Sequence, residues 1–360
     1  MIDINGELLA AADRLLDACV GENLDQLCTL DLRGDGVSRA LYQAARDIQR
    51  GPLTLAAASA LVKRARSGSD VLMLTGFLSP KPYPETDGLV GSAVLAHAIQ
   101  RACGARPVFA CESEVIAPLS AGLRGAGLSV TGDPSHRPDV PHAVVLPFPN
   151  GRDAAEAEAE RLARLVDASA CVAVERPGAN SRGQYHLAMG ANVSADIAPI
   201  DLLYQALAAR GVLTIAVGDF GNELGMGALY DVIRAETPAG ADCGCGCGGG
   251  IACPTHADIT VSASVSDWGA YAIAAYLSHL KRDPAVLVGA GAYRRMVDAT
   301  VAAGAIDGPT RYAVPWVDGV DDGFNAALLE VMRAAVRYPT LKSGHSPIRL
   351  FRAGRSLEGN

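Results

Sequence analysis

The sequence is poor in aromatic residues and in positive charge. Aromatic side chains make up 5% of the 360 residues, and 31 Lys and Arg against 39 Asp and Glu leave a net charge of −8. The deficit of positive charge argues against a nucleic-acid partner, because phosphate backbones are bound by basic surfaces. Gly and Ala abound instead, and this composition favours closely packed helices on a sheet over an aromatic-rich sandwich.

Membrane and secretion signals are also missing. No stretch of roughly 18 apolar residues, the length of a membrane-spanning helix, is free of charges and Gly or Pro breaks. Residues 1–7 show neither a basic region before an apolar core nor an Arg-rich composition, so we expect no secretory signal and no transit peptide. The nine cysteines then indicate reduced thiols rather than a disulfide framework, and we expect a cytoplasmic protein without membrane association.

Three common motifs of nucleotide-binding and hydrolytic sites are absent from the sequence. There is no G-x-x-x-x-G-K-[ST] phosphate loop, no G-x-S-x-G elbow and no H-E-x-x-H. Gly76 and Gly88 do not form the G-x-G-x-x-G of a nicotinamide site.

Hydrophobic periodicity predicts an α/β fold. Apolar residues at helical spacing predict three N-terminal helices, at 7–20, 37–49 and 54–66. Short apolar runs then alternate with helical segments; strands are expected at 71–75, 106–110, 128–131, 143–148, 171–174, 212–217 and 258–261. This alternation predicts a mostly parallel sheet covered by helices on both faces. We divide a single domain, 1–360, into an N-terminal helical layer (1–69), an α/β core (70–340) and a tail (341–360).

The most informative stretch is residues 218–227, GDFGNELGMG, between a predicted strand and a segment that can be helical. Ligands bind at the carboxyl ends of parallel strands, where glycines let the backbone approach them. A Gly-rich turn whose Asp caps the next helix would explain Asp219. It would not also explain Glu223.

Three further polar loops follow predicted strands, and a parallel sheet would bring all four loops to one edge. They are Glu85-Thr86-Asp87-Gly88, the loop from Glu175 and Arg176 to Arg182, and 262–268 with Ser264, Ser266 and Asp267. Asp87, Glu175, Asp219 and Glu223 offer only oxygen ligands, which favours Mg²⁺, Mn²⁺ or Ca²⁺. An ion pair with Arg176 or Arg182 explains Glu175 equally well. Helix capping is the simpler explanation for Asp87 and Asp267 taken alone.

A low-complexity tract places Cys243, Cys245 and Cys247 at alternate positions with glycine. The tract could bind a soft metal together with Cys253 and His256. However, it lacks the two-residue gap of common zinc sites, and no second ligand pair is visible. We therefore interpret it as a flexible loop of reduced thiols, with adventitious metal binding as the alternative, and His186 and His256 as structural histidines.

Taken together, these motifs resemble the D-glutamate cyclase C-terminal domain family. The resemblance rests on Thr75-Gly76-Phe77, Glu85-Thr86-Asp87-Gly88, Glu175-Arg176-Pro177-Gly178, Gly183-Gln184-Tyr185, residues 218–227 and Val265-Ser266-Asp267-Trp268-Gly269. It runs from about residue 70 to 319, and the N-terminal helices fit it too. Departures are Phe220, where the family more often has Gly, Asp267, where it often has Asn, and the Cys-Gly tract.

The resemblance implies an α/β enzyme that cyclises D-glutamate to 5-oxo-D-proline with loss of water. In our scheme a divalent metal held by Glu175, Asp219 and Glu223 polarises the γ-carboxylate, and Asp87 is the general base. Arg176 or Arg182 clamps the α-carboxylate, and backbone N–H groups of 221–225 stabilise the oxyanion. The predicted substrate contacts are Thr86, Arg176, Arg182, Gly221, Asn222, Gly225 and Ser266.

The same carboxylates would serve two other functions, which the sequence leaves open. One is a metal-dependent hydrolase of a small phosphate or carboxylate ester, and the other is a non-catalytic protein that binds a metal or an amino acid. The identity of the metal and the stereochemistry of the substrate are open as well. Helices rich in Ala and Gly would pack readily between subunits, which is compatible with a homo-oligomer.

Overall fold

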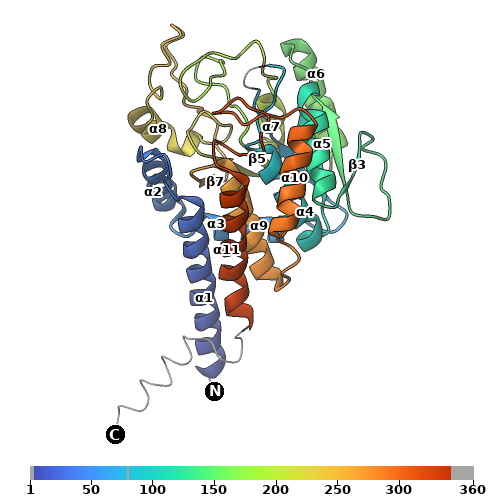
Figure 1. The fold of residues 1–360 in the computed structure, drawn as a ribbon, viewed down its shortest axis with the longest axis vertical. Coiled ribbons are helices and arrows are strands. Elements are labelled where there is room, and N and C mark those ends of the chain that lie inside the picture. The colour runs from blue at the N-terminus through green and yellow to red at the C-terminus, as the bar shows by residue number, and fades with distance from the viewer. Residues whose placement is uncertain (1–3, 79–80, 342–360) are drawn as a thin grey trace.

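A seven-stranded sheet forms the centre of the computed structural model, which describes residues 4–78 and 81–341 (Figure 1). The strands follow the order β3-β4-β2-β1-β5-β6-β7, and all of their pairings are parallel. Their bounds are β1 (Asp70–Leu74), β2 (Arg106–Cys111), β3 (Ser129–Thr131), β4 (His142–Pro147), β5 (Ala168–Val174), β6 (Leu213–Gly218) and β7 (Ile259–Ser262). The predicted α/β fold with a mostly parallel sheet is confirmed.

The strands are apolar on both faces because helices cover both faces. In β1 every residue is buried, with Leu72 and Leu74 on one face and Val71 and Met73 on the other. The first face is covered by α6 (Arg152–Leu165) and α7 (Asp201–Ala208).

The second face carries two layers of helices. Next to the strands lie α3 (Leu53–Arg64), α4 (Leu89–Cys103), α5 (Ser113–Gly125) and α9 (Ser266–Lys281). Outside them lie α1 (Ile4–Cys28), α10 (Ala290–Ala302) and α11 (Asp322–Leu341), with α1 and α11 side by side (Figure 1). Among the described residues, the remaining helices are α2 (Val37–Gln49), η1 (Gly227–Leu229) and α8 (Tyr230–Glu236).

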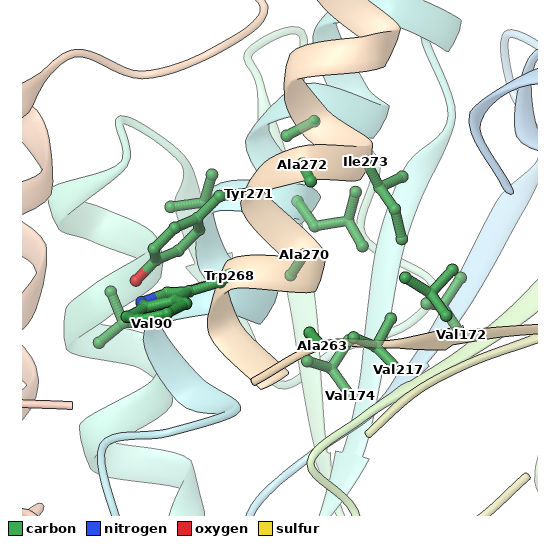
Figure 2. Packing of buried hydrophobic residues seen from close by; sticks show 14 of the residues in the cluster. Val90, Val172, Val174, Val217, Ala263, Trp268, Ala270, Tyr271, Ala272 and Ile273 are labelled. Atoms are coloured by element: carbon green, nitrogen blue, oxygen red, sulfur yellow. The ribbon is translucent and has the colours of Figure 1, made fainter. Parts of the chain in front are cut away.

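Helix α9 lies close against the strands because a glycine stands on its contact face. A Cβ on Gly269 would lie 2.5 Å from Val217 Cγ1, so only glycine fits there. Figure 2 shows Val172 and Val217 next to Ala270 and Ile273, while Trp268 and Tyr271 point toward Val90 of α4. This packing fixes the first turn of α9 at the carboxyl edge of the sheet.

The chain changes direction within the sheet at β1. Its successor β2 pairs on one side of β1, and β5 pairs on the other side. At such a topological switch point the loops after the two strands diverge and leave a crevice at their carboxyl ends. The loop of residues 75–88 follows β1 and the loop that begins at Glu175 follows β5, so two of the predicted site loops lie at this point.

The predictions that concern a membrane span and a C-terminal tail stand differently against the structure. In the described part of the chain, no helix combines the length and the apolarity needed to cross a membrane. The predicted tail begins at residue 341, and residues 342–360 lie outside the described residues. The boundaries between layer, core and tail stay predictions.

Candidate active site

Three carboxylates meet at the carboxyl ends of β1, β5 and β6. One oxygen each from Asp87, Glu175 and Asp219 lies within 4.8 Å of the other two. All three side chains belong to buried residues, although they come from positions far apart in the sequence. The parallel sheet therefore brings together three of the four carboxylates predicted for the site.

Asp87 is fixed by reciprocal capping between two helices. Its Oδ1 accepts the N–H of Asp267 at 2.8 Å, at the start of α9. In return, Asp267 Oδ1 accepts the N–H groups of Gly88 and Gly91 at 2.8 and 2.7 Å, at the start of α4. Capping was the simpler explanation for both residues, and each accepts N–H groups at the start of the other's helix, while Asp87 also accepts the N–H of Gly88 at the start of α4. The arrangement holds Asp87 rigidly beside Glu175 and Asp219.

Glu175 has a backbone conformation that favours glycine, with a φ of 43° directly after β5. A non-glycine residue in this region is strained, and such strain often accompanies functional sites. Its Oε2 accepts a hydrogen bond from Ser266 Oγ, and Oε1 accepts none from the described residues. A Cβ on Gly88 would lie 2.7 Å from Glu175 Cβ, so the glycine of the Glu85–Gly88 motif makes room for this carboxylate.

Asp219 is paired with Arg33, a residue that the sequence analysis missed. Arg33 Nη2 lies 3.1 Å from Asp219 Oδ2 and donates to the carbonyl oxygen of Ser264 at 2.6 Å. The guanidinium also lies 3.4 Å from Asp318 and 5.4 Å from the centre of the Phe220 ring. Arg33 belongs to the connection between α1 and α2, where no local motif distinguishes it.

Glu223 has a different role from the other carboxylates. It accepts the backbone N–H groups of Asp219 and Phe220 at 2.9 Å and that of Gly221 at 2.6 Å. The side chain thus holds the turn that presents Asp219. The sequence predicted Glu175, Asp219 and Glu223 as metal ligands, whereas the structure groups Asp87 with Glu175 and Asp219.

The substrate clamp predicted for Arg176 does not fit its environment. The guanidinium is fully buried and forms a bidentate pair with Glu112 at 2.6 and 2.7 Å. It also donates to the carbonyl oxygens of Gly76 and Ala198, so it ties three loops together. Arg182 is exposed and lies beside Gly249, in the cysteine tract, rather than beside the carboxylates.

Most of the other predicted substrate contacts hold loops in place. Thr86 Oγ1 donates to the carbonyl oxygen of Trp316 at 2.6 Å, and Asn222 Nδ2 to that of His186 at 3.0 Å. Gly221 donates its N–H to Glu223, so it is not free to stabilise an oxyanion. A Cβ on Gly225 would lie 2.4 Å from Ala216 Cβ, which explains this glycine by packing. Of this set only Ser266 contacts a clustered carboxylate.

Glu85 is a further acidic residue beside the site, although the sequence analysis quoted it only as part of a motif. It is half-buried, and its side chain lies against Gly308. Its carboxylate accepts no hydrogen bond from the described residues. Burial raises its pKa well above the ordinary value, and the charges of Asp318 and Asp219 raise it further.

The site concentrates negative charge in a buried place. Burial raises the pKa of Glu175 and of Asp87, and the neighbouring charges of Asp219 and Asp267, respectively, add to it. Burial and the charge of Asp219 raise the pKa of Glu223 to about 8. The repulsion among these carboxylates falls when they are protonated or when they bind a cation.

The donor set fits a hard divalent cation. Carboxylate oxygens are the ligands that Mg²⁺, Mn²⁺ and Ca²⁺ prefer, and ligand distances of about 2.0 to 2.6 Å put two such oxygens up to about 5 Å apart. The separations within 4.8 Å among Asp87, Glu175 and Asp219 satisfy this condition.

Comparison with known proteins points to one family. The family model described as D-glutamate cyclase-like, C-terminal, matches residues 24–333, which include every clustered carboxylate and Arg33. A curated human protein named D-glutamate cyclase, mitochondrial, is 32% identical over 232 residues. The match covers 61% of this chain and 34% of that protein, so the chain spans about a third of its relative's length.

Proposed function

Because the chain belongs to the D-glutamate cyclase-like, C-terminal family, we propose that it is a lyase that converts D-glutamate to 5-oxo-D-proline with loss of water. The observation that supports this most strongly is the meeting of Asp87, Glu175 and Asp219 at the topological switch point. The resemblance drawn from the sequence motifs is confirmed at the level of the family. The reaction and the metal remain our proposal.

The reaction needs one group that moves protons. A bond forms between the α-nitrogen and the γ-carboxyl carbon, and one carbon–oxygen bond of that carboxyl group breaks. The ammonium nitrogen loses two protons, and the departing oxygen leaves as water with two protons. No proton is consumed overall, so one carboxyl group is sufficient if it accepts the two protons from nitrogen in turn and passes each to the departing oxygen.

We assign the proton transfer to Glu85 instead of Asp87. Burial raises the pKa of both carboxyl groups, so their hydrogen bonds distinguish them. Asp87 accepts backbone N–H groups, which hold its carboxylate in place and suit a metal ligand. Glu85 accepts no hydrogen bond from the described residues, so its carboxyl group can take up and release a proton without breaking one. When bound by Asp87, Glu175 and Asp219, a divalent cation would supply Lewis-acid polarisation of the γ-carboxylate.

We assign recognition of the α-carboxylate to Arg33 instead of Arg176. The side chain of Arg33 is 32% exposed, whereas that of Arg176 is fully buried. A guanidinium presents parallel N–H groups that match a carboxylate. Its contact with Asp219 sets it beside the clustered carboxylates, so the α-carboxylate and the γ-carboxylate of one small substrate can be bound together.

The proposal is tested by incubating the purified protein with D-glutamate and Mg²⁺ or Mn²⁺ and measuring 5-oxoproline by chiral chromatography. We expect turnover of D-glutamate and much less of L-glutamate. Glu85→Gln should lower kcat by about 100-fold or more while the cation still binds, because general acid–base catalysis contributes that much.

The matched control is Glu114→Gln, which removes a carboxylate paired with Lys81 in the same region and should leave kcat within about twofold. Phosphate or acid release from an ester panel without any 5-oxoproline would contradict the lyase and favour the hydrolase. A thermal shift with D-glutamate but no product would favour a binding protein.

The cytoplasmic location and the homo-oligomer also remain proposals. The name of the human relative places that protein in mitochondria. Cell fractionation tests the location, and light scattering after size-exclusion chromatography tests the oligomeric state.

A further inference from the structure

The cysteine tract has a folded geometry that its composition did not suggest. Gly244, Gly246 and Gly248 have φ values of 71°, 87° and 71°, and alternate residues in this left-handed region turn the chain tightly. Cys243 Sγ consequently lies 3.1 Å from Cys245 Sγ and 3.4 Å from Cys247 Sγ. Three thiols from five consecutive residues therefore point to one place.

A histidine from another loop completes the group. His186, in the segment after β5, is 1% exposed, and its Nε2 lies 3.3 Å from Cys245 Sγ and 3.9 Å from Cys247 Sγ. The ligand atoms of His186 and the three cysteines all lie within 4.8 Å of one another. The interpretation of the tract as a flexible loop of thiols and of His186 as only structural overlooked this convergence.

Neighbouring residues donate hydrogen bonds to one sulfur of the group and leave room for the loops that carry the ligands. Asn180 Nδ2 and the backbone N–H of Gly249 both donate to Cys247 Sγ at 3.4 Å, which favours a thiolate. A Cβ on Gly190 would lie 2.4 Å from the carbonyl oxygen of Cys243, so this glycine allows the two loops to approach each other. These contacts position the ligands from outside the group.

We propose that His186, Cys243, Cys245 and Cys247 form a tetrahedral binding site for Zn²⁺. Zinc–sulfur bonds of about 2.3 Å and a zinc–nitrogen bond of about 2.0 Å give tetrahedral edges of about 3.5 to 3.8 Å. Four of the six separations lie between 3.1 and 3.9 Å, close to these edges, and all six lie within 4.8 Å. Three thiolates and one imidazole select zinc over the hard cations that suit the carboxylate group.

The zinc site would fasten the two loops that flank the carboxylates. His186 is linked through its carbonyl oxygen to Asn222, and the N–H of Cys253 donates to the carbonyl oxygen of Gly221 at 3.1 Å. Both contacts end on the turn that presents Asp219. Zinc at this place is structural, because all four tetrahedral positions are filled by protein ligands. The proposal does not depend on the reaction assigned above.

The test is the zinc content of the full chain, purified without chelator and measured by plasma mass spectrometry. We expect about one zinc per chain in the wild type and in Cys19→Ser/Cys103→Ser, whose cysteines lie outside the group. In Cys245→Ser/Cys247→Ser the zinc content should fall about tenfold or more. Equal zinc contents in the two double variants would overturn the proposal.

Two measurements on the wild type keep the proposal testable if a variant does not fold. X-ray absorption at the zinc edge should show three sulfurs and one nitrogen, and a shell dominated by oxygen would overturn the assignment. After denaturation with chelator and without reductant, all nine cysteines should react with a thiol reagent. Two missing thiols that peptide mapping assigns to the group would show a disulfide there and would also overturn the proposal.

Discussion

The carboxylate group and the cysteine group are two ways of gathering metal ligands in one molecule. Asp87, Glu175 and Asp219 are separated by tens of residues, and strand ends of a rigid sheet bring them together. In the cysteine group three of four ligands lie within five residues, and left-handed glycines bring them together. The residues of the first group are all buried, while the second group includes the exposed Cys245. Rigid architecture can thus assemble distant residues, whereas a local tract needs special backbone conformations.

The groups also differ in charge. Buried carboxylates repel one another, which is why burial and neighbouring charges raise the pKa values of Asp87 and Glu175. Neutral thiols do not repel, and they acquire charge when a metal displaces their protons. We therefore expect the two regions to respond differently to substitution, pH and metal.

The largest effect should follow from Asp219→Asn. The variant removes one clustered carboxylate and the partner of Arg33, so we expect kcat/KM to fall by about 1000-fold or more. Isothermal titration should show weaker Mn²⁺ binding, while the zinc content of the cysteine group stays unchanged. Full activity in this variant would contradict the role of the carboxylate group, and loss of zinc would contradict the independence of the two regions.

Alanine substitutions at two glycines with positive φ should separate the cost of backbone strain from the cost of steric overlap. In Gly88→Ala the new Cβ would lie 2.7 Å from Glu175 Cβ and 2.8 Å from Thr75 Oγ1, at a φ of 79°. Gly244 has a similar φ of 71° but no atom within 4 Å of a new Cβ.

We expect Gly88→Ala to lower the free energy of unfolding by about 3 kcal/mol or more, from strain and crowding together. The matched variant Gly244→Ala should cost about 1 kcal/mol from strain alone. Urea unfolding measures both values, and equal losses would show that crowding at the carboxylate group has no effect.

Two arginines test which region binds substrate. Arg33 contacts the carboxylate group, and Arg182 lies beside the cysteine tract. Arg33→Ala should raise KM for D-glutamate by roughly 10- to 100-fold, because a charge-assisted pair with the α-carboxylate is lost. Arg182→Ala should change KM less than about twofold. Steady-state kinetics measures both KM values. A larger rise in Arg182→Ala than in Arg33→Ala would show that the substrate binds beside the cysteine tract.

The smallest effect should be the response of stability to pH. Glu223 and Asp267 have folded pKa values of about 8 and about 6, above their ordinary values of 4.5 and 3.8. The metal-free folded state then holds more protons than the unfolded state, so stability should fall as the pH rises from 5 to 8. We expect the Tm of the metal-free protein to fall over this range.

Calorimetry of Cys245→Ser/Cys247→Ser isolates this response from any zinc. Added Mn²⁺ should restore Tm mainly at the higher pH, where the carboxylates are charged. Zinc binding by wild type should instead weaken as the pH falls, because its thiols must lose protons. A Tm that rises from pH 5 to 8 without metal would contradict the raised pKa values.

The strands and their polar loops could be predicted because their signals are local. The apolar run 71–75 nearly coincides with β1, and the expected helix 37–49 matches α2. Glu175 and Asp219 were found because carboxylates directly after buried strands stand out from their neighbours. Their approach to each other followed from the parallel sheet that the alternation predicts.

Other parts of the site could not be predicted because they depend on contacts distant in sequence. Arg33 lies 186 residues from Asp219 and 285 from Asp318, and neither separation leaves a local pattern. Arg176 directly follows Glu175, but its guanidinium pairs with Glu112 in the interior while Glu175 joins the carboxylates. His186 and the cysteine tract can each be recognised in the sequence, but the sequence does not show that they lie next to each other in the fold.

The sequence by itself determined the α/β architecture and the edge of the sheet that carries the site, because hydrophobic periodicity and strand-end polarity act over a few residues. Tertiary structure alone decided the role of each side chain. It made Glu223 the support of a turn, Arg176 half of a buried ion pair, and Arg33 the partner of Asp219. It also brought His186 to three cysteines. These roles depend on which atoms meet across the fold, and packing sets those meetings rather than spacing along the chain.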